Sequence, residues 1–272
     1  MNKVELQRIA DKTGVPIGTV MIDYALSVFL SDIAKQKISK HLVFKGGTAL
    51  RKCYFSEYRF SLDIDFTDPT GNSVASFSSY LHSLENETMH DVTFGPAKDV
   101  DMGKKQMRYQ LNYYFEDDPK EDRNETIIVD YIKGEVCCGK ETRQINAGYG
   151  LGKDKIDCMT LKEIYAEKIR AIYGRTKARD VYDLGNLINK GIRFDEDLVN
   201  RKLAERYPNR ITFDFETFAK NLAGYEKTWR FDLEPLLPQG AIPDFSTVTK
   251  IVLKEINQPP AWGNVRQRSC LY

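Results

Sequence analysis

The chain has 272 residues, and its 40 lysines and arginines nearly balance its 39 aspartates and glutamates, for a formal net charge of +1. This balance excludes a strong overall field for nucleic acid or membranes and leaves only a local patch for nucleic acid. The length allows one large domain or two modest ones. Five cysteines without a C-x-x-C spacing, and scattered histidines, argue against a disulfide framework and a zinc site. The sequence shows neither an apolar signal core nor a membrane-spanning apolar run, so we expect a cytoplasmic protein without membrane contact.

The first ~40 residues show helical periodicity, in LQRIADKTGV and TVMIDYALSVFLSDIAKQ. This stretch resembles a DNA-reading helix-turn-helix, with Ala10, Gly14 and Val20 at suitable places. The second helix, however, continues into an apolar run from Tyr24 to Leu30, which favours packing over exposure in a DNA groove. We therefore expect packing helices, and a DNA-binding module built on them is the alternative.

The next segment, HLVFKGGTALRKCYFSEYRFSLDIDF from His41 to Phe66, places a glycine pair ahead of two acids. We expect HLVF to form a short strand and Gly46 and Gly47 to turn the chain, with Thr48 as the cap of the following helix. A helix N-terminus offers unpaired N–H groups, and glycines let a phosphate approach the backbone closely. The pattern predicts a phosphate site.

The D-x-D motif lies on a predicted strand, where side chains alternate between two faces. The polar face carries Ser61, Asp63 and Asp65, and the other face carries Leu62, Ile64 and Phe66. Two acids on one face repel each other and are relieved by a cation. Carboxylate oxygens suit Mg²⁺, which also binds nucleotide phosphates, with Mn²⁺ as the alternative ion. The motif therefore predicts a metal site.

After a helix expected near Ser76 to Glu87, two more strands follow. MRYQLNYYF predicts a half-buried strand, because it alternates an apolar face (Tyr109, Leu111, Tyr113, Phe115) with a polar one (Arg108, Gln110, Asn112). DDPKEDRNE then predicts a hairpin-like link to TIIVDYI, which is apolar on both faces except for Asp130. A buried acid there is costly without a cation or partner. We predict Asp130 as a third carboxylate of the metal site, and an acid paired with an arginine is the alternative.

The segment from Glu135 to Asp157, rich in glycine and lysine, is expected to be a linker to a helical second half. We place the division at residues 1–145 and 146–272. The second half favours helices in LKEIYAEKIRAIYGR, RDVYDLGNLINK, DEDLVNRKLAERY and TFAKNLAGYEKTWRFDL.

Lys168 interrupts the apolar stripe of the helix that begins near Leu161. The stripe consists of Leu161, Ile164, Tyr165, Ile169 and Ile172, and the side expected to face solvent carries Glu163, Glu167 and Arg170. One interpretation is that the lysine snorkels to solvent. The other is that Lys168 faces a cleft and meets an anion, nucleotide phosphate being the first candidate.

The following segment, GRTKARDVYDL, adds local positive charge through Arg175, Lys177 and Arg179. Asp180 and Asp183 lie three residues apart at the start of the next helix, so they are neighbours on its surface. Asp180 either faces the core or the cleft, on the side of Leu184 and Leu187, or caps the helix. The sequence does not choose between the two aspartates.

Four motifs together resemble the AbiEii-type nucleotidyltransferase toxins of the polymerase-beta-like superfamily. They are KGGTAL from Lys45, RFSLDIDF from Arg59, AEKIRA from Ala166 and RDVYDL from Arg179. The resemblance covers most of Asp23 to Leu187, including part of the N-terminal helices, and beyond about Lys190 only the general helical character is similar.

The resemblance implies an α+β, bilobed protein, with a nucleotidyltransferase-type mixed β-sheet lobe and flanking helices, plus a mainly α-helical C-terminal lobe. By this similarity Gly46, Gly47 and Thr48 bind triphosphate together with Ser61, while Asp63 and Asp65 bind Mg²⁺. Lys168 would contact phosphate, and Asp180 or Asp183 would complete the site. Leu62 stands where many relatives carry an acid, but its side chain is expected to point away from the metal face.

The expected activity is transfer of a nucleoside monophosphate from an NTP to an acceptor hydroxyl, with RNA at the 3′ end of tRNA as the expected acceptor. Asp63, Asp65 and Asp130 would hold two Mg²⁺ ions, and Asp130 is the first candidate to accept the hydroxyl proton. The resemblance implies a bacterial or phage-defence toxin and a separately encoded antitoxin. Two alternatives are an enzyme that modifies a small molecule or protein and a non-catalytic DNA-binding or interaction module. The base of the NTP cannot be read from the sequence.

Overall fold

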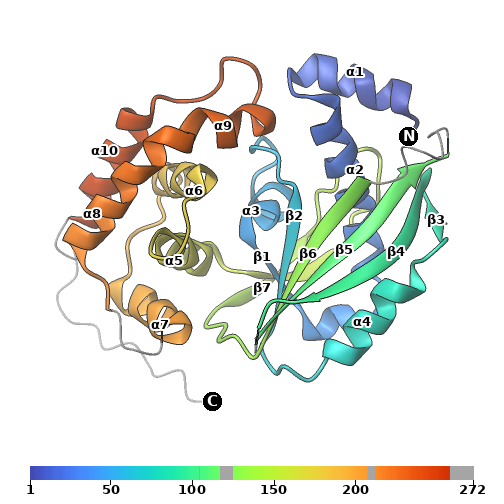
Figure 1. The fold of residues 1–272 in the computed structure, drawn as a ribbon, viewed down its shortest axis with the longest axis horizontal. Coiled ribbons are helices and arrows are strands. Elements are labelled where there is room, and N and C mark those ends of the chain that lie inside the picture. Colours follow the sequence, from blue (N-terminus) through green and yellow to red (C-terminus); the bar gives the residue numbers. More distant parts are fainter. Residues whose placement is uncertain (104, 117–124, 208–211, 258–272) are drawn as a thin grey trace. The chain divides into compact units, whose positions relative to one another are not determined.

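The computed structural model describes residues 1–103, 105–116, 125–207 and 212–257 (Figure 1). The chain divides into two compact units. Unit 1 comprises Met1–Met159 and Pro235–Gly240, and unit 2 comprises Thr160–Glu234 and the described part of Ala241–Tyr272.

Unit 1 is built on a sheet of eight strands in the order β3-β4-β5-β6-β2-β1-β8-β7. The strands are β1 Val43–Lys45, β2 Asp63–Asp68, β3 Thr88–Met89, β4 Val92–Asp101, β5 Gln106–Phe115, β6 Glu125–Lys133, β7 Lys140–Gln144 and β8 Lys155–Met159. The pairs β2–β6 and β1–β8 are parallel, and the remaining pairs are antiparallel. The sheet is therefore mixed, as predicted for the α+β class.

The helices of unit 1 are α1 Lys3–Thr13, α2 Ile17–Ile33, the 3₁₀ helix η1 Lys37–His41, α3 Gly46–Ala49, the π-helix η2 Leu50–Tyr54 and α4 Val74–Ser83. Phe77 of α4 contacts the rings of Phe66, Tyr109 and Tyr131, and Tyr24 of α2 stacks on Phe115. Because these rings belong to strands β2, β5 and β6, α2 and α4 cover the apolar face of the sheet.

The second N-terminal helix is a core helix, because every residue from Tyr24 to Leu30 is buried. The predicted packing is confirmed, and α2 does not present the exposed surface that a DNA-reading helix requires. No single helix among the described residues has the length and apolar character to cross a membrane, whereas α1 and α2 pass that test only as a pair bent by 117°.

The alternation predicted for MRYQLNYYF is confirmed in β5. Its four apolar-face residues are buried, and Arg108, Gln110 and Asn112 on the other face are intermediate in exposure. β6 lies between β5 and β2, as expected of a central strand. Residues 117–124, most of the predicted DDPKEDRNE link, lie outside the described residues.

The sequence predicted a linker from Glu135 to Asp157, but the structure shows that this segment is not a simple linker. It contains β7 and most of β8, and β8 pairs with both β1 and β7. Three of its glycines, Gly148, Gly150 and Gly152, lie between these strands, and Gly148 and Gly150 have φ of +76° and +72°. For this reason unit 1 continues to Met159, beyond the division predicted after residue 145.

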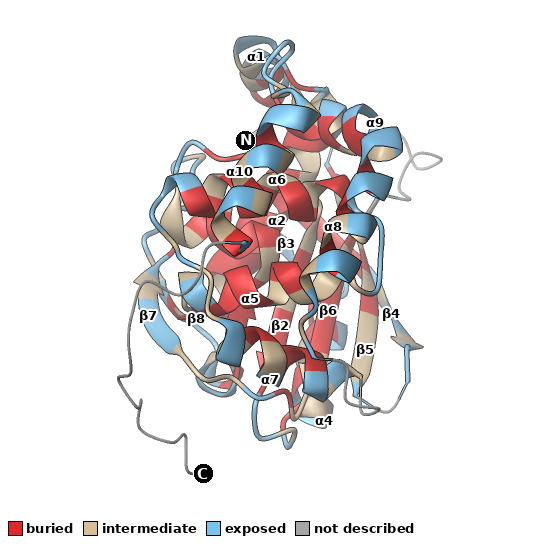
Figure 2. Ribbon diagram, turned by 90° about the vertical axis from the view of Figure 1, so that its left-hand side faces the viewer, coloured by how far each residue is buried: buried red, intermediate tan, exposed pale blue. Residues whose placement is uncertain are grey.

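Unit 2 is helical. Its elements are α5 Leu161–Ile172, α6 Ala178–Asn189, α7 Glu196–Arg206, α8 Phe215–Ala223, the 3₁₀ helix η4 Gly224–Thr228, α9 Trp229–Leu233 and α10 Phe245–Ile256. The short 3₁₀ turn η5 Glu234–Leu236 follows α9 and lies at the boundary, with two of its three residues in unit 1. The predicted helices are confirmed, and α10 was not predicted. Figure 2 shows the buried faces of α5 and α6, whose buried residues include Ile164, Ile169, Val181 and Leu184.

Candidate active site

A row of charged side chains crosses four neighbouring strands of unit 1. In the sheet register, Lys45 of β1 pairs with Asp65 of β2, Asp65 pairs with Asp130 of β6, and Asp130 pairs with Arg108 of β5. Residues paired in register project from the same face of a sheet. We call these four residues the charged row. It places two carboxylates side by side between two cations, on the face opposite the aromatic core.

The two acids of the D-x-D motif share that face, as predicted, because Asp63 lies two residues before Asp65 on β2. Both are only partly buried, whereas Ile64 and Phe66 between and after them are fully buried. Ser61 projects toward the same place, and its Oγ lies 3.2 Å from Oδ1 of Asp63. The apolar residues therefore anchor the strand, and the acids stay accessible.

Asp130 is bound by Arg108 through both carboxylate oxygens. Nε donates to Oδ1 and Nη2 donates to Oδ2, each at 2.8 Å. The hydrogen bond to Asp130 is the main cause that raises the pKa of Arg108, and the charges of Asp63 and Asp65 add to it. The arginine pairing that the sequence left as an alternative is thus present. Among the described residues, no three His, Cys, Asp or Glu side chains are grouped as metal ligands. Because Arg108 binds both oxygens of Asp130, this aspartate would have to give up a bond to Arg108 to join a metal site.

The other end of the charged row is also paired. The ammonium of Lys45 binds the carboxylate of Glu135, and both side chains are 4% exposed. Glu135 lies two residues after the end of β6. The sequence did not single out Lys45, Arg108 or Glu135, because only the pairing of four strands brings them beside the acids.

The glycine pair is required by two close side chains. Gly46 has φ +77°, and a Cβ there would overlap the carboxylate of Asp65. A Cβ on Gly47 would lie 2.5 Å from Nη2 of Arg59, whose side chain is buried. The two glycines thus let an acid of β2 and a buried arginine approach the turn. Arg59 also donates from Nη1 to the carbonyl of Phe60 at 2.9 Å.

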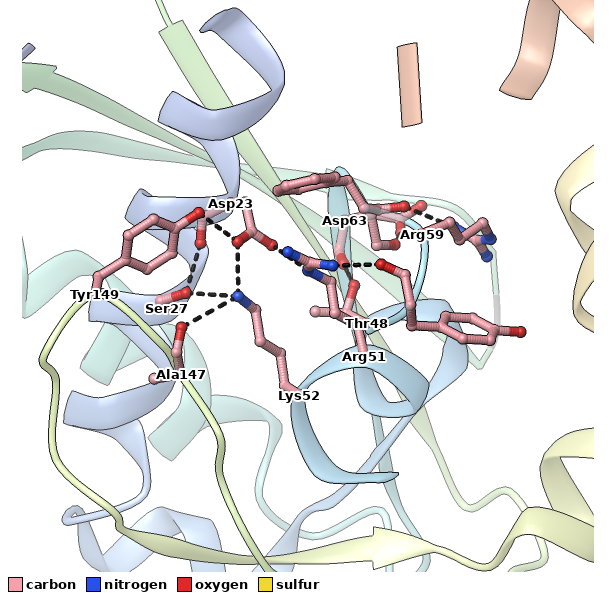
Figure 3. A network of polar contacts seen from close by, with 12 residues as sticks. Asp23, Ser27, Thr48, Arg51, Lys52, Arg59, Asp63, Ala147 and Tyr149 are labelled. Atoms are coloured by element: carbon pink, nitrogen blue, oxygen red, sulfur yellow. Dashed lines mark hydrogen bonds and ion pairs between the residues drawn. The ribbon is translucent and has the colours of Figure 1, made fainter. Parts of the chain in front are cut away.

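The helix after the glycine pair begins earlier than predicted. α3 starts at Gly46 with Lys45 as its N-cap, and no side chain caps it. Thr48 is therefore inside the first turn and not the cap. It is fully buried, and its hydroxyl donates to the main-chain oxygen of Asp63 (Figure 3). Through this hydrogen bond, Thr48 in the first turn of α3 connects the helix to the acidic strand β2.

In unit 2, Lys168 meets both aspartates between which the sequence could not choose. Its Nζ lies 2.8 Å from Oδ1 of Asp180 and 2.6 Å from Oδ2 of Asp183. The lysine side chain is 7% exposed and both aspartates are fully buried. The ammonium is therefore not in solvent, which excludes snorkelling, and the anions that it contacts within this unit are carboxylates.

Asp180 also forms an ion pair with a second cation, Arg175. Arg175 donates from Nε to Oδ2 at 2.9 Å and from Nη2 to Oδ1 at 3.1 Å. Burial alone would raise the pKa of Asp180, but the charges of Lys168 and Arg175 outweigh it and hold the pKa well below the ordinary value. This aspartate stays ionised inside the unit.

Glu163 does not lie on a solvated side of α5, contrary to the prediction. It is 1% exposed, and its carboxylate lies 2.6 Å from Nζ of Lys202 on α7. The second partner of Lys202, Glu167, is also nearly buried. α7 packs against this side of α5, so the polar positions form buried ion pairs and not a surface.

The predicted site residues thus fall into two sets. Unit 1 brings together Gly46, Gly47, Thr48, Ser61, Asp63, Asp65 and Asp130. Unit 2 brings together Lys168, Asp180 and Asp183. The glycines and paired acids of unit 1 suit the binding of a metal and a polyphosphate.

The comparisons with known proteins agree with this chemistry. A family model described as "Nucleotidyl transferase AbiEii toxin, Type IV TA system" matches residues 28–250. The comparison with curated proteins gives no match.

Several solved structures are similar in fold, among them MenT4 and JHP933. MenT4, a nucleotidyltransferase toxin from Mycobacterium tuberculosis, has a TM-score of 0.69 at 19% identity, covering 94% of this chain and 89% of that chain. JHP933 from Helicobacter pylori has a TM-score of 0.55 at 20% identity, covering 85% of this chain and 87% of that chain. At these identities the likeness shows the fold alone. The family model spans most of the sequence, so this chain belongs to the AbiEii family of nucleotidyltransferase toxins of type IV toxin–antitoxin systems.

Proposed function

We propose that this nucleotidyltransferase transfers a nucleoside monophosphate from an NTP to a hydroxyl of RNA, with the 3′ end of tRNA as the first acceptor to test. The observation that carries the proposal is the pair Asp63 and Asp65 on the half-buried polar face of β2, with Gly46 in contact distance of Asp65. Family membership supplies the reaction class and implies a separately encoded antitoxin and an NTP substrate.

The donor set fits a divalent cation. Asp63 and Asp65 present oxygen ligands on one face, and Asp130 lies beside Asp65 in the sheet register. We propose that Asp63 and Asp65 hold Mg²⁺, with Mn²⁺ as a substitute, and that Asp130 joins them when Arg108 releases one oxygen. When bound, the ion would neutralise the charge of the triphosphate and of the leaving pyrophosphate.

The remaining work falls to the chain itself. Gly46 and Gly47 allow a phosphate to approach the start of α3 without a Cβ in the way. Ser61 orients Asp63, and Thr48 fixes the main chain of the same residue. Asp130 remains our candidate to accept the proton of the acceptor hydroxyl, through the carboxylate oxygen that does not hold the metal. The role of Lys168 in phosphate binding stays a prediction from the family resemblance, as does completion of the site by Asp180 or Asp183.

The test is label transfer from each of the four α-labelled NTPs to purified tRNA, total RNA, protein and small-molecule fractions with Mg²⁺. We expect one RNA fraction to be labelled, and Asp63→Asn or Asp65→Asn to abolish labelling while the protein stays folded. Undiminished transfer in both variants would overturn the metal assignment. Labelling of the protein or small-molecule fraction alone would show that the acceptor is a protein or a small molecule and not RNA.

The biological setting is part of the same proposal. We propose a bacterial growth-inhibiting or phage-defence toxin that acts in the cytoplasm, where NTPs and tRNA are found. Growth arrest on expression, relieved by the product of a neighbouring gene and lost in Asp63→Asn, is the expected result. Arrest by the Asp63→Asn variant would contradict it.

A further inference from the structure

Asp23 is a buried carboxylate on α2 that three donors reach from other parts of unit 1 (Figure 3). It is 1% exposed. Arg51 Nε lies 3.2 Å from its Oδ1, and Lys52 Nζ and the Tyr149 hydroxyl lie 2.8 and 2.6 Å from its Oδ2. A buried carboxylate is costly unless it is fully bonded. The three donors meet that requirement, so the contacts around Asp23 hold together the segments that supply them.

Two of these donors come from the helical run that begins at the glycine pair. Arg51 and Lys52 lie in η2, directly after α3. Lys52 also donates to Oγ of Ser27 on α2 at 2.8 Å and to the carbonyl of Ala147 at 3.3 Å. The run Gly46–Tyr54 is thereby fastened to α2 on one side and to the turn before β8 on the other.

The third donor stands on an unusual backbone. Tyr149 has φ +55°, between two glycines that are also left-handed. A residue with a Cβ in this region costs about 1–2 kcal/mol, and such conformations persist only where the surroundings hold them. Its hydroxyl bonds to Asp23, and its ring centroid lies 5.5 Å from Nζ of Lys52. The turn is therefore held in place by the same carboxylate.

Arg51 carries the connection on to the acidic strand. Its Nη1 donates to the carbonyl of Tyr58, and its guanidinium carbon lies 3.8 Å from the centroid of the Phe60 ring. Residues 58–60 lead directly into Ser61 and Asp63. Thr48, in the same helical run, donates to the main chain of Asp63. The helical run thus contacts the acidic strand and the segment before it at two points, through Arg51 and Thr48. Asp23 in turn binds the run through Arg51 and Lys52.

We propose that Asp23 is a positioning residue for nucleotidyl transfer, which acts through Arg51 and Lys52 to fix the glycine turn and Asp63 relative to each other. It rests on the proposed function, because the atoms that it positions are those assigned to the metal and the triphosphate. Asp23 itself touches no substrate. A displacement of about 1 Å in a reacting group costs on the order of 10²-fold in rate, which is the scale of effect expected here.

The experiment compares Asp23→Asn and Arg51→Lys with wild type in label transfer from α-labelled NTP to the acceptor identified above. Arg51→Lys keeps the positive charge, but a single ammonium cannot reach Asp23 and Tyr58 and stack on Phe60 together. We expect kcat to fall by about 10- to 100-fold with a smaller change in KM for NTP, because the metal and phosphate groups are misplaced and not removed. Tyr149→Phe, which removes one neutral donor, should give a smaller loss in the same direction.

Leu81→Ala is the matched control, since it removes a buried side chain of α4 in the same unit without touching the network. Activities are compared at temperatures equally far below each variant's Tm. If Arg51→Lys and Asp23→Asn lose no more kcat than Leu81→Ala, the network is only structural and the proposal is overturned. If Asp23→Asn does not fold, Arg51→Lys and Tyr149→Phe decide.

A second readout separates failure of this proposal from failure of the proposed function. If wild type transfers no label to any fraction, the proposed function fails, and hydrogen exchange of the apo protein then tests the network alone. Faster exchange confined to residues 46–66 in Arg51→Lys, and absent in Leu81→Ala, supports the positioning role. Equal or uniformly spread acceleration in both variants overturns it.

Discussion

The acids of the two units are satisfied in opposite ways. In unit 2 the carboxylates of Asp180 and Asp183 are fully buried and share Lys168, and Asp180 also binds Arg175. In unit 1 Asp63 and Asp65 are only partly buried, and Asp65 lies side by side with Asp130 on one face of the sheet. Removal of one partner from a buried ion pair leaves an uncompensated charge and destabilises the fold, whereas accessible acids side by side favour a cation from solution. The first set should therefore respond to substitution in stability and the second in activity.

Removal of the shared cation of unit 2 should have the largest effect on stability. Lys168→Met leaves two buried carboxylates without their common partner, and breaking a buried pair in this way costs about 3–5 kcal/mol. Urea unfolding measures the loss. Lys162→Met, at an exposed position of the same helix, should change the free energy of unfolding by no more than ~0.5 kcal/mol. A Lys168→Met protein as stable as wild type would break the comparison.

The acids of unit 1 should show the reverse response. Asp65→Asn should lower kcat/KM for label transfer by about 10²- to 10³-fold, the loss typical of one electrostatic group in an active site. The Tm should change little, because Asp65 is only partly buried. Glu57→Gln, at an exposed position in the preceding segment, should change neither quantity. A large drop in Tm with activity retained would show that Asp65 is structural.

The glycine turn connects stability and activity in unit 1. Gly46→Ala combines a left-handed φ with an overlap on the Asp65 carboxylate, whereas Gly191→Ala in unit 2 has φ +86° with open space around it. The backbone term of about 1–2 kcal/mol applies to both, and overpacking adds ~1–3 kcal/mol at Gly46 only. Thermal unfolding and label transfer should both be worse for Gly46→Ala. Equal losses in the two variants would mean that the contact with Asp65 is unimportant.

Acid should weaken unit 2 through Asp180. Its pKa in the folded chain lies below the ordinary value, so the stabilisation is fully present above pH ~4 and is lost as the pH falls from there through the folded pKa. Fluorescence of Trp229, which lies in unit 2, can follow this transition in a Trp262→Phe protein. Asp180→Asn should flatten the dependence on acid. An unchanged acid transition in that variant would assign it to other carboxylates.

The smallest expected effect is at a helix cap of unit 2. Asp195 accepts a hydrogen bond from the main-chain N–H of Leu198 at 3.0 Å and caps α7. Asp195→Ala should cost about 1 kcal/mol, which a denaturant series resolves, and should leave label transfer unchanged. Loss of activity would indicate that α7 bears on the reaction and not only on stability.

Local patterns in the sequence were sufficient for elements whose chemistry repeats along one strand or helix. The alternation of β5, the shared face of Asp63 and Asp65 and the buried run of α2 all follow from spacing within one element. The sequence did not decide whether Asp180 or Asp183 completes the site, and in the structure both aspartates contact Lys168.

The rest depended on contacts between distant segments. The charged row requires the register of four strands, and Glu163 was assigned to solvent because its partner, Lys202, lies on another helix. The segment before Met159 was predicted as a linker because glycines and lysines outweigh its short strands, which become strands only by pairing with β1 and with each other. The role of Asp23 could not be predicted from its largely apolar helix, because its three donors come from distant segments of the chain.

The charged row also sets an order for the assembly of the protein. Its members lie between residues 45 and 130, and β2 must insert between β1 and β6, parallel to a strand made some sixty residues later. Such non-local pairing is slow, because the intervening chain must be closed before contacts repay the loss of entropy. The acids therefore come together only when the central sheet is complete. A nascent or partly folded chain of this toxin should be inert, and catalytic competence should appear late in folding, together with the native sheet.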